Sequence, residues 1–248
     1  LDNSGTANND GSVCSGDAVT MDAGSHTSYK WSSGETSQTI SKTSGGTYTV
    51  TVTNSCGSTN TASYTVTENN NPTASISGAD AYCSGNGPVT WDGSGSSAGS
   101  GSVSSYSWQV SGFEMGTGTS YDVSLSGSYD LVVTNSNGCS NSTSKSLTIN
   151  SNPTATITNN SGTTELTCNQ TSISLTGNGG NTFSWSGGSN PGWKTNTFTS
   201  PGTYTMTTTS SSTGCSASTS IVLTQDISTP TASITNNTGT TTITCTDA

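Results

Sequence analysis

The sequence predicts an all-β protein made of tandem immunoglobulin-like β-sandwiches, and three observations support this fold class. A Gly-x-Tyr motif followed by a Thr/Val-rich run and a cysteine occurs three times, at 46–56, 127–139 and 202–215. An aromatic-x-Trp pair precedes each copy, and each repeat holds one early and one late cysteine. A glycine turn, a run of β-branched residues and a second turn are typical of the short strands of a sandwich.

The composition predicts small modules with thin cores. Hydrophobic residues make up 27% of the chain and charged residues 7%, against typical values of about 45–50% with glycine counted and about 25%. Disorder usually accompanies high net charge and few aromatic residues. Here the net charge is only -10 over 248 residues, and Trp and Tyr recur regularly. We therefore expect folded modules with a hydroxyl- and amide-rich surface.

Prolines at 72, 153 and 230 mark a repeat of about 80 residues. Proline holds the preceding residue extended and cannot donate to a sheet, which suits a linker that enters an edge strand. Residues 230–245 match residues 153–168 almost position for position. The predicted modules are residues 1–69, 70–150 and 151–228, followed at 229–248 by the opening strands of a fourth module or by a donor strand.

Short strands are expected in the same order in every module. Each lies between clusters of Gly, Asn, Ser or Pro, which punctuate strands. The predicted strands are 18–21, 29–31, 37–40, the Tyr48 strand and 62–67 in the first module; 74–76, 89–91, 106–110, 121–125, the Tyr129 strand and 146–149 in the second; and 155–157, 173–175, 183–185, 197–198, the Tyr204 strand and 221–223 in the third.

The recurring aromatic residues are interpreted as the centres of the cores. Period-two spacing places both rings of an aromatic-x-Trp pair on one face of a strand. A glycan-binding platform could have the same spacing, but recurrence in every module with few other large apolar residues favours packing. The predicted core aromatics are Trp31, Tyr48, Trp108, Tyr129, Trp185 and Tyr204.

Seven cysteines predict one disulfide within each module. The chain has no Cys-x-x-Cys spacing and a single histidine, which excludes a zinc site. Each bridge would close a loop of roughly 40–60 residues and contribute about 4 kcal/mol. Such bridges persist outside the cytoplasm, so we expect an extracellular protein; reduced buried thiols in a cytosolic protein are the alternative. The expected pairs are Cys14–Cys56, Cys83–Cys139 and Cys168–Cys215, with Cys245 unpaired in this window.

We expect three functions to be absent: nucleic-acid binding, membrane insertion and catalysis. The chain has no arginine and four scattered lysines, so it lacks the basic surface that binds nucleic acid. No run of about 18 apolar residues is present, so we expect no membrane insertion in this segment. His26 is isolated, no Gly-x-Ser-x-Gly motif occurs and the acids are dispersed, so we expect no enzyme.

No cofactor is expected, with calcium as the one alternative. Asp17, Asp22, Asp80 and Asp92 lie near predicted strand ends, where calcium can rigidify tandem sandwiches. No Asp-x-Asp-x-Asp loop is present, which favours solvated acids.

Two kinds of glycan contact are candidates. Trp193 has no counterpart in the other modules and lies in a turn-rich segment, where it could stack on a sugar ring, contact a module or cover the third core. Asn-x-Ser/Thr sequons are expected by chance in so polar a chain. The candidate glycosylation sites are Asn141, Asn159, Asn169 and Asn236, together with exposed Ser and Thr.

The second module resembles the polycystic-kidney-disease (PKD) type domain. The resemblance rests on the Asp-x-Ser-Gly-Ser-Ser turn at 92–97, the Tyr-x-Trp strand at 103–108 and the Gly-Ser-Tyr-Asp-Leu-Val-Val strand at 127–133, which is similar to the Gly-x-Tyr-x-Val strand of that family. Where that family continues Trp-Asp-Phe-Gly-Asp-Gly, this chain has Trp-Gln-Val-Ser-Gly at 108–112. Tandem arrays rich in Thr, Ser and Asn are similar to the repetitive regions of large surface adhesins and gliding filaments that Gram-negative bacteria export by the type IX route. The resemblance implies a role in reach and attachment.

These observations predict the shaft or spacer of an extracellular filament or cell-surface adhesin. Three modules would reach about 100 Å. The expected partners are neighbouring modules or copies of itself, and surface glycans. Two alternatives remain: a carbohydrate-binding accessory region of a secreted enzyme, and a self-assembling fibre subunit whose C-terminal strand completes the first module of a neighbour. Either a window on a longer array or a complete subunit would explain the partial fourth repeat.

Overall fold

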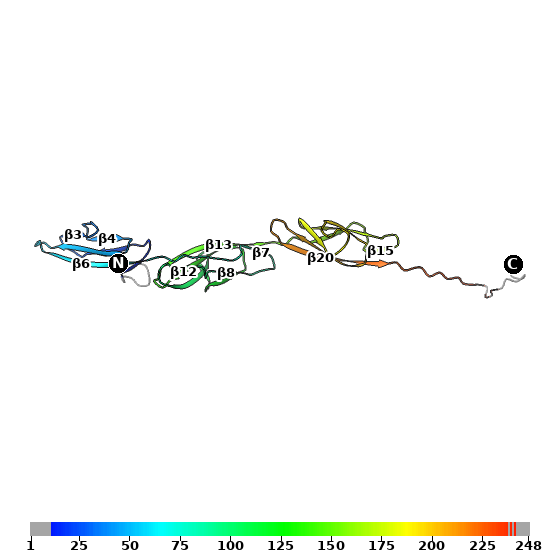
Figure 1. The fold of residues 1–248 in the computed structure, drawn as a ribbon, viewed down its shortest axis with the longest axis horizontal. Coiled ribbons are helices and arrows are strands. Elements are labelled where there is room, and N and C mark those ends of the chain that lie inside the picture. The colour runs from blue at the N-terminus through cyan, green and yellow to red at the C-terminus, as the bar shows by residue number, and fades with distance from the viewer. Residues whose placement is uncertain (1–10, 238, 240, 242–248) are drawn as a thin grey trace. The chain divides into compact units, whose positions relative to one another are not determined.

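The computed structural model describes residues 11–237, 239 and 241, and these residues form strands, turns and loops (Figure 1). No helix occurs in this part of the chain, and so no helix there could span a membrane. The chain forms two compact units that divide between Asn150 and Ser151. The prediction of an all-β protein with tandem immunoglobulin-like sandwiches is confirmed, whereas the prediction of a disulfide inside each module is wrong, as shown below.

The first module has two sheets around one core. The larger sheet has the order β1-β6-β5-β3, and the smaller pairs β2 with β4. Val13, Val19, Trp31, Ile40 and Val66 are among the buried residues between them. The strands are β1 (Ser12–Cys14), β2 (Val19–Asp22), β3 (Ser28–Trp31), β4 (Thr39–Lys42), β5 (Gly46–Thr53) and β6 (Thr59–Asn69), with β3, β4 and β6 labelled in Figure 1.

The second module repeats this plan with a longer sheet. The larger sheet has the order β10-β9-β12-β13-β7, and β11 pairs with β8. Its core contains Trp91, Trp108, Leu131 and Leu147. The strands are β7 (Ala81–Cys83), β8 (Val89–Asp92), β9 (Val103–Val110), β10 (Phe113–Thr117), β11 (Ser120–Val123), β12 (Gly127–Asn135) and β13 (Ser140–Asn150).

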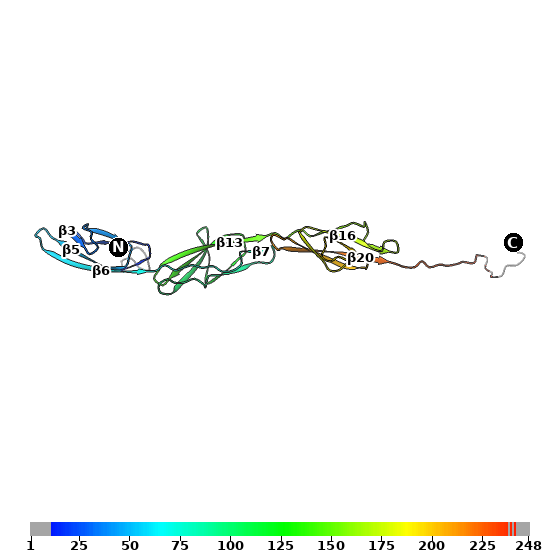
Figure 2. The same ribbon diagram turned by 45° about the horizontal axis from the view of Figure 1, so that its top comes forward.

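The third module adds a strand to the smaller sheet. The two sheets have the orders β15-β20-β19-β17 and β14-β16-β18, so β16 and β20, labelled in Figure 2, belong to opposite layers. Its core contains Ile173, Leu175, Trp185, Phe198 and Met206. The strands are β14 (Thr156–Asn159), β15 (Glu165–Thr167), β16 (Ile173–Asn178), β17 (Thr182–Trp185), β18 (Thr195–Phe198), β19 (Gly202–Thr209) and β20 (Ser216–Asp226).

One tryptophan is buried at the same place in each module. In each module this tryptophan lies at or near the end of the strand that pairs with the Gly-x-Tyr strand. The residues are Trp31 in β3, Trp108 in β9 and Trp185 in β17. Each indole N–H donates to a backbone carbonyl, that of Ser37, Gly118 or Trp193, at 2.9–3.0 Å. A buried indole N–H needs such a partner, because leaving it unpaired would cost the desolvation free energy of the group.

The tyrosines of the Gly-x-Tyr motifs lie at the ends of the cores. Tyr129 is buried, whereas Tyr48 and Tyr204 are partly buried against the cores of their modules. Each hydroxyl donates to the carbonyl of the residue four positions earlier, at 2.8–3.0 Å. Burial, with help from the nearby Tyr121, raises the pKa of Tyr129 above its usual value. The motif therefore anchors the start of its strand to the preceding turn.

The segment before each early cysteine was not predicted as a strand. The three-residue strands β1, β7 and β15 pair in parallel with the ends of β6, β13 and β20. Three residues are too short to show a hydrophobic period. The strand predicted at 74–76 is wrong: isolated bridges at Thr73 and Ser77 flank it, and the Ser75 N–H donates to the Ser96 hydroxyl at 3.0 Å.

Candidate functional site

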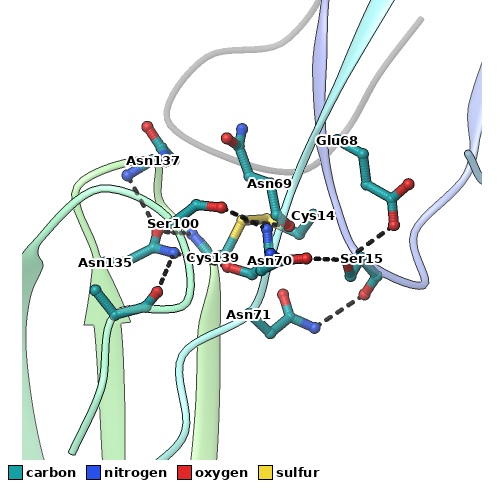
Figure 3. Close-up of a disulfide and its surroundings, with 11 residues drawn as sticks. Cys14, Ser15, Glu68, Asn69, Asn70, Asn71, Ser100, Asn135, Asn137 and Cys139 are labelled. Atoms are coloured by element: carbon teal, nitrogen blue, oxygen red, sulfur yellow. Dashed lines mark hydrogen bonds between the residues drawn. A yellow bond between two sulfur atoms is a disulfide. The ribbon is translucent and has the colours of Figure 1, made fainter. Parts of the chain in front are cut away.

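The central feature of the first unit is a disulfide between its two modules. Cys14 of the first module bonds to Cys139 of the second, with Cα atoms 5.5 Å apart and a sequence separation of 125 residues (Figure 3). Two of the predicted pairs, Cys14–Cys56 and Cys83–Cys139, are therefore wrong. The early cysteine of one module pairs with the late cysteine of the next.

The length of one strand explains why the predicted pairing fails. Cys14 lies opposite Asn69 at the end of β6, whereas Cys56 precedes the start of β6 at Thr59. Eleven residues of β-strand separate these two ends, and at about 3.3 Å per residue the two cysteines lie roughly 30 Å apart or more. A disulfide requires Cα atoms within about 7 Å. The two cysteines of one module thus lie at opposite ends of it.

The other cysteines follow from the same geometry. Cys168 directly follows β15, which pairs with the end of β20, while Cys215 directly precedes the start of β20. Cys168 is an exposed free thiol, so the predicted pair Cys168–Cys215 is also wrong. Cys56 is exposed and free as well, whereas Cys83 and Cys215 are disulfide-bonded. Cys245 lies outside the described residues.

Asn135 is the polar centre of the joint around this disulfide. Its side chain is almost completely buried, and its Oδ1 accepts from the backbone N–H groups of Asn137 and Cys139, each at 3.0 Å. Its Nδ2 donates to the carbonyls of Asn70 and Ala98 at 3.1 and 2.9 Å (Figure 3). One side chain thus ties the β12–β13 turn of the second module to the linker that leaves the first.

The linker residues make further bonds on both sides. Asn70 N–H donates to the Ser100 hydroxyl of the second module at 2.8 Å, and Asn141 Nδ2 donates to the Pro72 carbonyl at 3.0 Å. Asn71 Nδ2 donates to the carbonyl of Ser15 in the first module at 2.9 Å (Figure 3). No buried side-chain polar atom among the described residues lacks a partner. The joint is therefore a fully hydrogen-bonded polar contact, which favours one fixed geometry.

A carboxylate supports the turn on the first-module side. Glu68 accepts from the N–H of Gly45 at 3.2 Å and from the Ser15 hydroxyl at 2.9 Å. These two hydrogen bonds, that from Gly45 first, hold the pKa of Glu68 below its usual value. Ser15 directly follows Cys14, so Glu68 helps to hold the disulfide-bearing segment against the end of β6.

The joint connects opposite ends of two modules. It contains the C-terminal end of β6 in the first module and the β12–β13 turn in the second, from which β13 leads away. The disulfide bypasses the linker, so the two modules remain covalently connected in series by two routes.

The structure leaves Trp193 on the surface. Its side chain is 71% exposed, which contradicts a role as a cover over the third core. Only its backbone takes part in the core, because its carbonyl accepts the indole N–H of Trp185. The ring is free to contact a ligand or another module.

The four aspartates near strand ends have separate structural roles. Asp22 and Asp92 each accept the backbone N–H two residues on, from Gly24 and Ser94. Asp80 forms an ion pair with Lys145. Asp17 lies in a turn, where its backbone N–H donates to the Cys14 carbonyl. Within the described part of the chain, no group of three or more His, Cys, Asp or Glu side chains could hold a metal ion.

The histidine is isolated. The ring of His26 lies edge-on to that of Tyr29, with ring centroids 6.2 Å apart. The Tyr29 hydroxyl accepts the backbone N–H of His26 and lies within hydrogen-bond distance of the carbonyls of Gly24 and His26. These contacts hold the turn between Gly24 and Tyr29 in place.

The sequon asparagines differ in how their side chains are used. Asn141 Nδ2 is bonded in the joint, and Asn159 Nδ2 donates to the Thr163 carbonyl at 2.9 Å. Asn169 and Asn236 are exposed. A glycan on Asn141 would leave Nδ2 one N–H, the one that donates to the Pro72 carbonyl.

Sequence reasoning did not find the residues of the joint. Asn135, Ser100 and Ser15 lack any distinguishing pattern in a chain so rich in Asn and Ser. Two features of the sequence could have indicated the joint. One is the Asn run at 69–71 directly before Pro72. The other is the asparagine at the start of two equivalent turns, Asn54 in the turn at 54–58 and Asn135 in the turn at 135–139.

Comparisons with known proteins show similarity in fold alone. No family model matches the chain, and no curated protein matches it. Among solved structures, three N-terminal domains of the outer capsid protein Hoc of bacteriophage RB49 are 13% identical, with a TM-score of 0.40 over 87% of this chain and 96% of that one. A 1.5-MDa bacterial ice-binding adhesin is 15% identical, with a TM-score of 0.40 over 88% and 95%. An I-band fragment of titin is 15% identical, with a TM-score of 0.36 over 87% and 95%.

Proposed function

We propose that the chain is part of the shaft of an extracellular filament or cell-surface adhesin. The observation that carries this proposal is the joint, where a disulfide and the bonds of Asn135 hold two modules in series. A spacer needs modules that keep a fixed order and resist separation. A disulfide bond also requires an oxidising compartment, which supports a location outside the cytoplasm.

Pulling the chain by its two ends tests this role. In the oxidised chain the disulfide shields the residues between Cys14 and Cys139 from tension, since the force passes through the sulfur atoms. Full extension of the reduced chain should exceed that of the oxidised chain by at least about 400 Å, from 125 residues at about 3.3–3.6 Å each. Equal extensions with and without reductant would contradict a joint that carries tension.

The finer features of this role belong to the same proposal. They include the division into modules at 1–69, 70–150, 151–228 and 229–248, the PKD type of the second module, and export by the type IX route. We also propose glycans on exposed sequons, of which Asn169 is an example. An intact mass of the native protein that equals the sequence mass would contradict glycosylation.

A second candidate is a carbohydrate-binding accessory region, and the exposed ring of Trp193 favours it. Aromatic rings in the open stack on the apolar faces of sugars. Binding to a glycan array that disappears in Trp193→Ala would support this function. Unchanged binding in that variant, or no binding by the parent chain, would contradict it.

A further inference from the structure

The disulfide of the joint is almost completely buried. Cys14 and Cys139 are 5% and 1% exposed. The carbonyl oxygen of Asn69 lies 3.9 Å from Cys139 Sγ, so the linker covers the bridge on one side (Figure 3). A reducing thiolate has to reach one of the two sulfur atoms, because the reaction passes through a mixed disulfide. Neither sulfur atom offers that access while the joint is closed.

The second module holds the linker, residues 69–72, in this covering position. Asn135 Nδ2 donates to the Asn70 carbonyl at 3.1 Å, and the Asn70 N–H donates to the Ser100 hydroxyl at 2.8 Å. At the end of the linker, Asn141 Nδ2 donates to its last carbonyl at 3.0 Å. These hydrogen bonds oppose any movement of the linker away from the disulfide.

Asn135 connects the linker to the turn that carries one of the sulfur atoms. Its Oδ1 accepts the N–H of Cys139 at 3.0 Å, while its Nδ2 donates to the Asn70 carbonyl. One buried side chain thus sets the position of Cys139 and of the segment that covers it. Removal of this side chain deprives the Asn70 carbonyl of a donor, which favours movement of the linker.

A glycine allows the linker to lie this close to the second module. Gly99 has a φ of +68°, which favours glycine, and a Cβ at this position would clash with the carbonyl oxygens of Asn70 and Asn71. Gly112 in the same module has a φ of +82°, but a Cβ there would meet no atom within 4 Å. An alanine therefore causes backbone strain at both positions, and it displaces the linker only at Gly99.

We propose that the joint gates the reduction of its own disulfide: a dithiol reduces the Cys14–Cys139 bridge only after the linker has moved away from it. A thiolate of the dithiol attacks one sulfur and forms a mixed disulfide with that cysteine, while the other cysteine leaves as a thiolate and takes up a proton. The second thiol of the reductant then displaces the first cysteine. Both cysteines end as thiols, and the dithiol ends as a disulfide.

This gating goes beyond the mechanical role proposed above and does not depend on it, because it concerns a chain under no load. A closed joint keeps the bridge oxidised in a medium that contains thiols. An open joint makes the same bridge reducible, and after reduction the linker is the only covalent connection between the two modules.

The rate at which dithiothreitol reduces the full chain tests this gating. Cys56 and Cys168 are alkylated first, because they are exposed free thiols that could exchange with the bridge. Labelling of the newly formed thiols and mass spectrometry of the peptides then follow Cys14 and Cys139 separately from the other cysteines. We expect reduction about a hundredfold slower than that of oxidised glutathione, because several hydrogen bonds have to open first. A rate equal to that of oxidised glutathione would overturn the proposal.

Two matched pairs of variants identify the gate. Asn135→Ala should accelerate reduction by about tenfold or more, whereas Asn54→Ala, in the equivalent turn of the first module, should leave the rate unchanged. Gly99→Ala should accelerate it by a similar factor, and Gly112→Ala should not. Equal rates within either pair would contradict the proposal. If Asn135→Ala does not fold, the glycine pair decides alone.

The dependence of the rate on urea separates opening of the joint from unfolding of a module. Opening of the joint exposes little surface, so the rate should change by less than about twofold at urea concentrations below the unfolding transition. Unfolding of a module exposes much more surface. A rate that rises steeply from the lowest urea concentration would overturn the proposal, because unfolding would then control reduction. The force experiment above compares chains that are already oxidised or already reduced, so its outcome is independent of this one.

Discussion

Buried tryptophan rings determine the stability of each module at the scale of single residues. Trp108 is fully buried and stacks on Tyr121 with ring centroids 5.9 Å apart. Trp108→Ala should lower the free energy of unfolding by about 3–5 kcal/mol, because it leaves a large cavity in a small core. Trp193→Ala, which removes an exposed ring, should change it by less than about 0.5 kcal/mol. Urea denaturation compares the two, and equal effects would contradict this account of the core.

An ion pair on the first module gives a prediction at acid pH. The hydrogen bond from Lys42, followed by that from Ser33, lowers the pKa of Glu35 to about 2 from 4.5. Because the folded pKa lies below the unfolded one, the carboxylate stabilises the fold above pH 4.5 and this contribution is lost as the pH falls towards 2. Lys42→Ala should raise the pKa of Glu35 towards 4.5 in an NMR titration, and Lys30→Ala should leave it unchanged. A pKa unaffected by Lys42→Ala would refute the assigned cause.

Residue types were predictable from the sequence where their spacing was regular. The aromatic-x-Trp pairs and Gly-x-Tyr motifs recur once per repeat, and the structure places their rings in or against the cores. Trp91 was not among the expected core aromatics, although it is fully buried. Its counterparts in the other modules are Met21 and Leu175, so the position is apolar throughout but aromatic only once.

At the scale of elements, the bridge between modules should stabilise the first unit. A loop of 125 residues removes much conformational entropy from the unfolded chain, so the double variant Cys14→Ser, Cys139→Ser should lower the free energy of unfolding by about 2–5 kcal/mol. Cys56→Ser should have little effect, since Cys56 is free and exposed. Denaturation of both variants without reductant provides the comparison; similar losses would count against the bridge.

Asn135 and Asn54 form a matched pair in equivalent turns. Both accept two backbone N–H groups, but only Asn135 also donates across the joint. Asn135→Ala should therefore cost about 1–3 kcal/mol more than Asn54→Ala, because the carbonyls of Asn70 and Ala98 lose their donor. Proteolysis of the linker at 69–72 should become faster only in Asn135→Ala. Equal susceptibility in the two variants would exclude the assigned role of the joint.

The cysteine pairing shows where sequence reasoning failed and why. Both cysteines of a module recur with the period of the repeat, and a periodic pattern is compatible with pairing inside a module or between modules. The distance between them depends on the length of the last strand and on the parallel register of β1 with β6. Neither is visible from composition or spacing, since β1 has three residues and β6 shows little alternation in burial.

For the whole molecule, the central claim is that disulfides run from the early cysteine of one module to the late cysteine of the next. Cys14 of the first module pairs with Cys139 of the second in this way, whereas Cys56 and Cys168 are free. A module with a thin core gains stability from the neighbour to which it is linked.

The most direct test is to digest the native, unreduced protein and to identify its linked peptides by mass spectrometry after alkylation of free thiols. The account predicts a Cys14–Cys139 peptide pair, and label on Cys56 and Cys168. Recovery of Cys14–Cys56 and Cys83–Cys139 pairs would contradict it, since the bridges would then lie inside the modules.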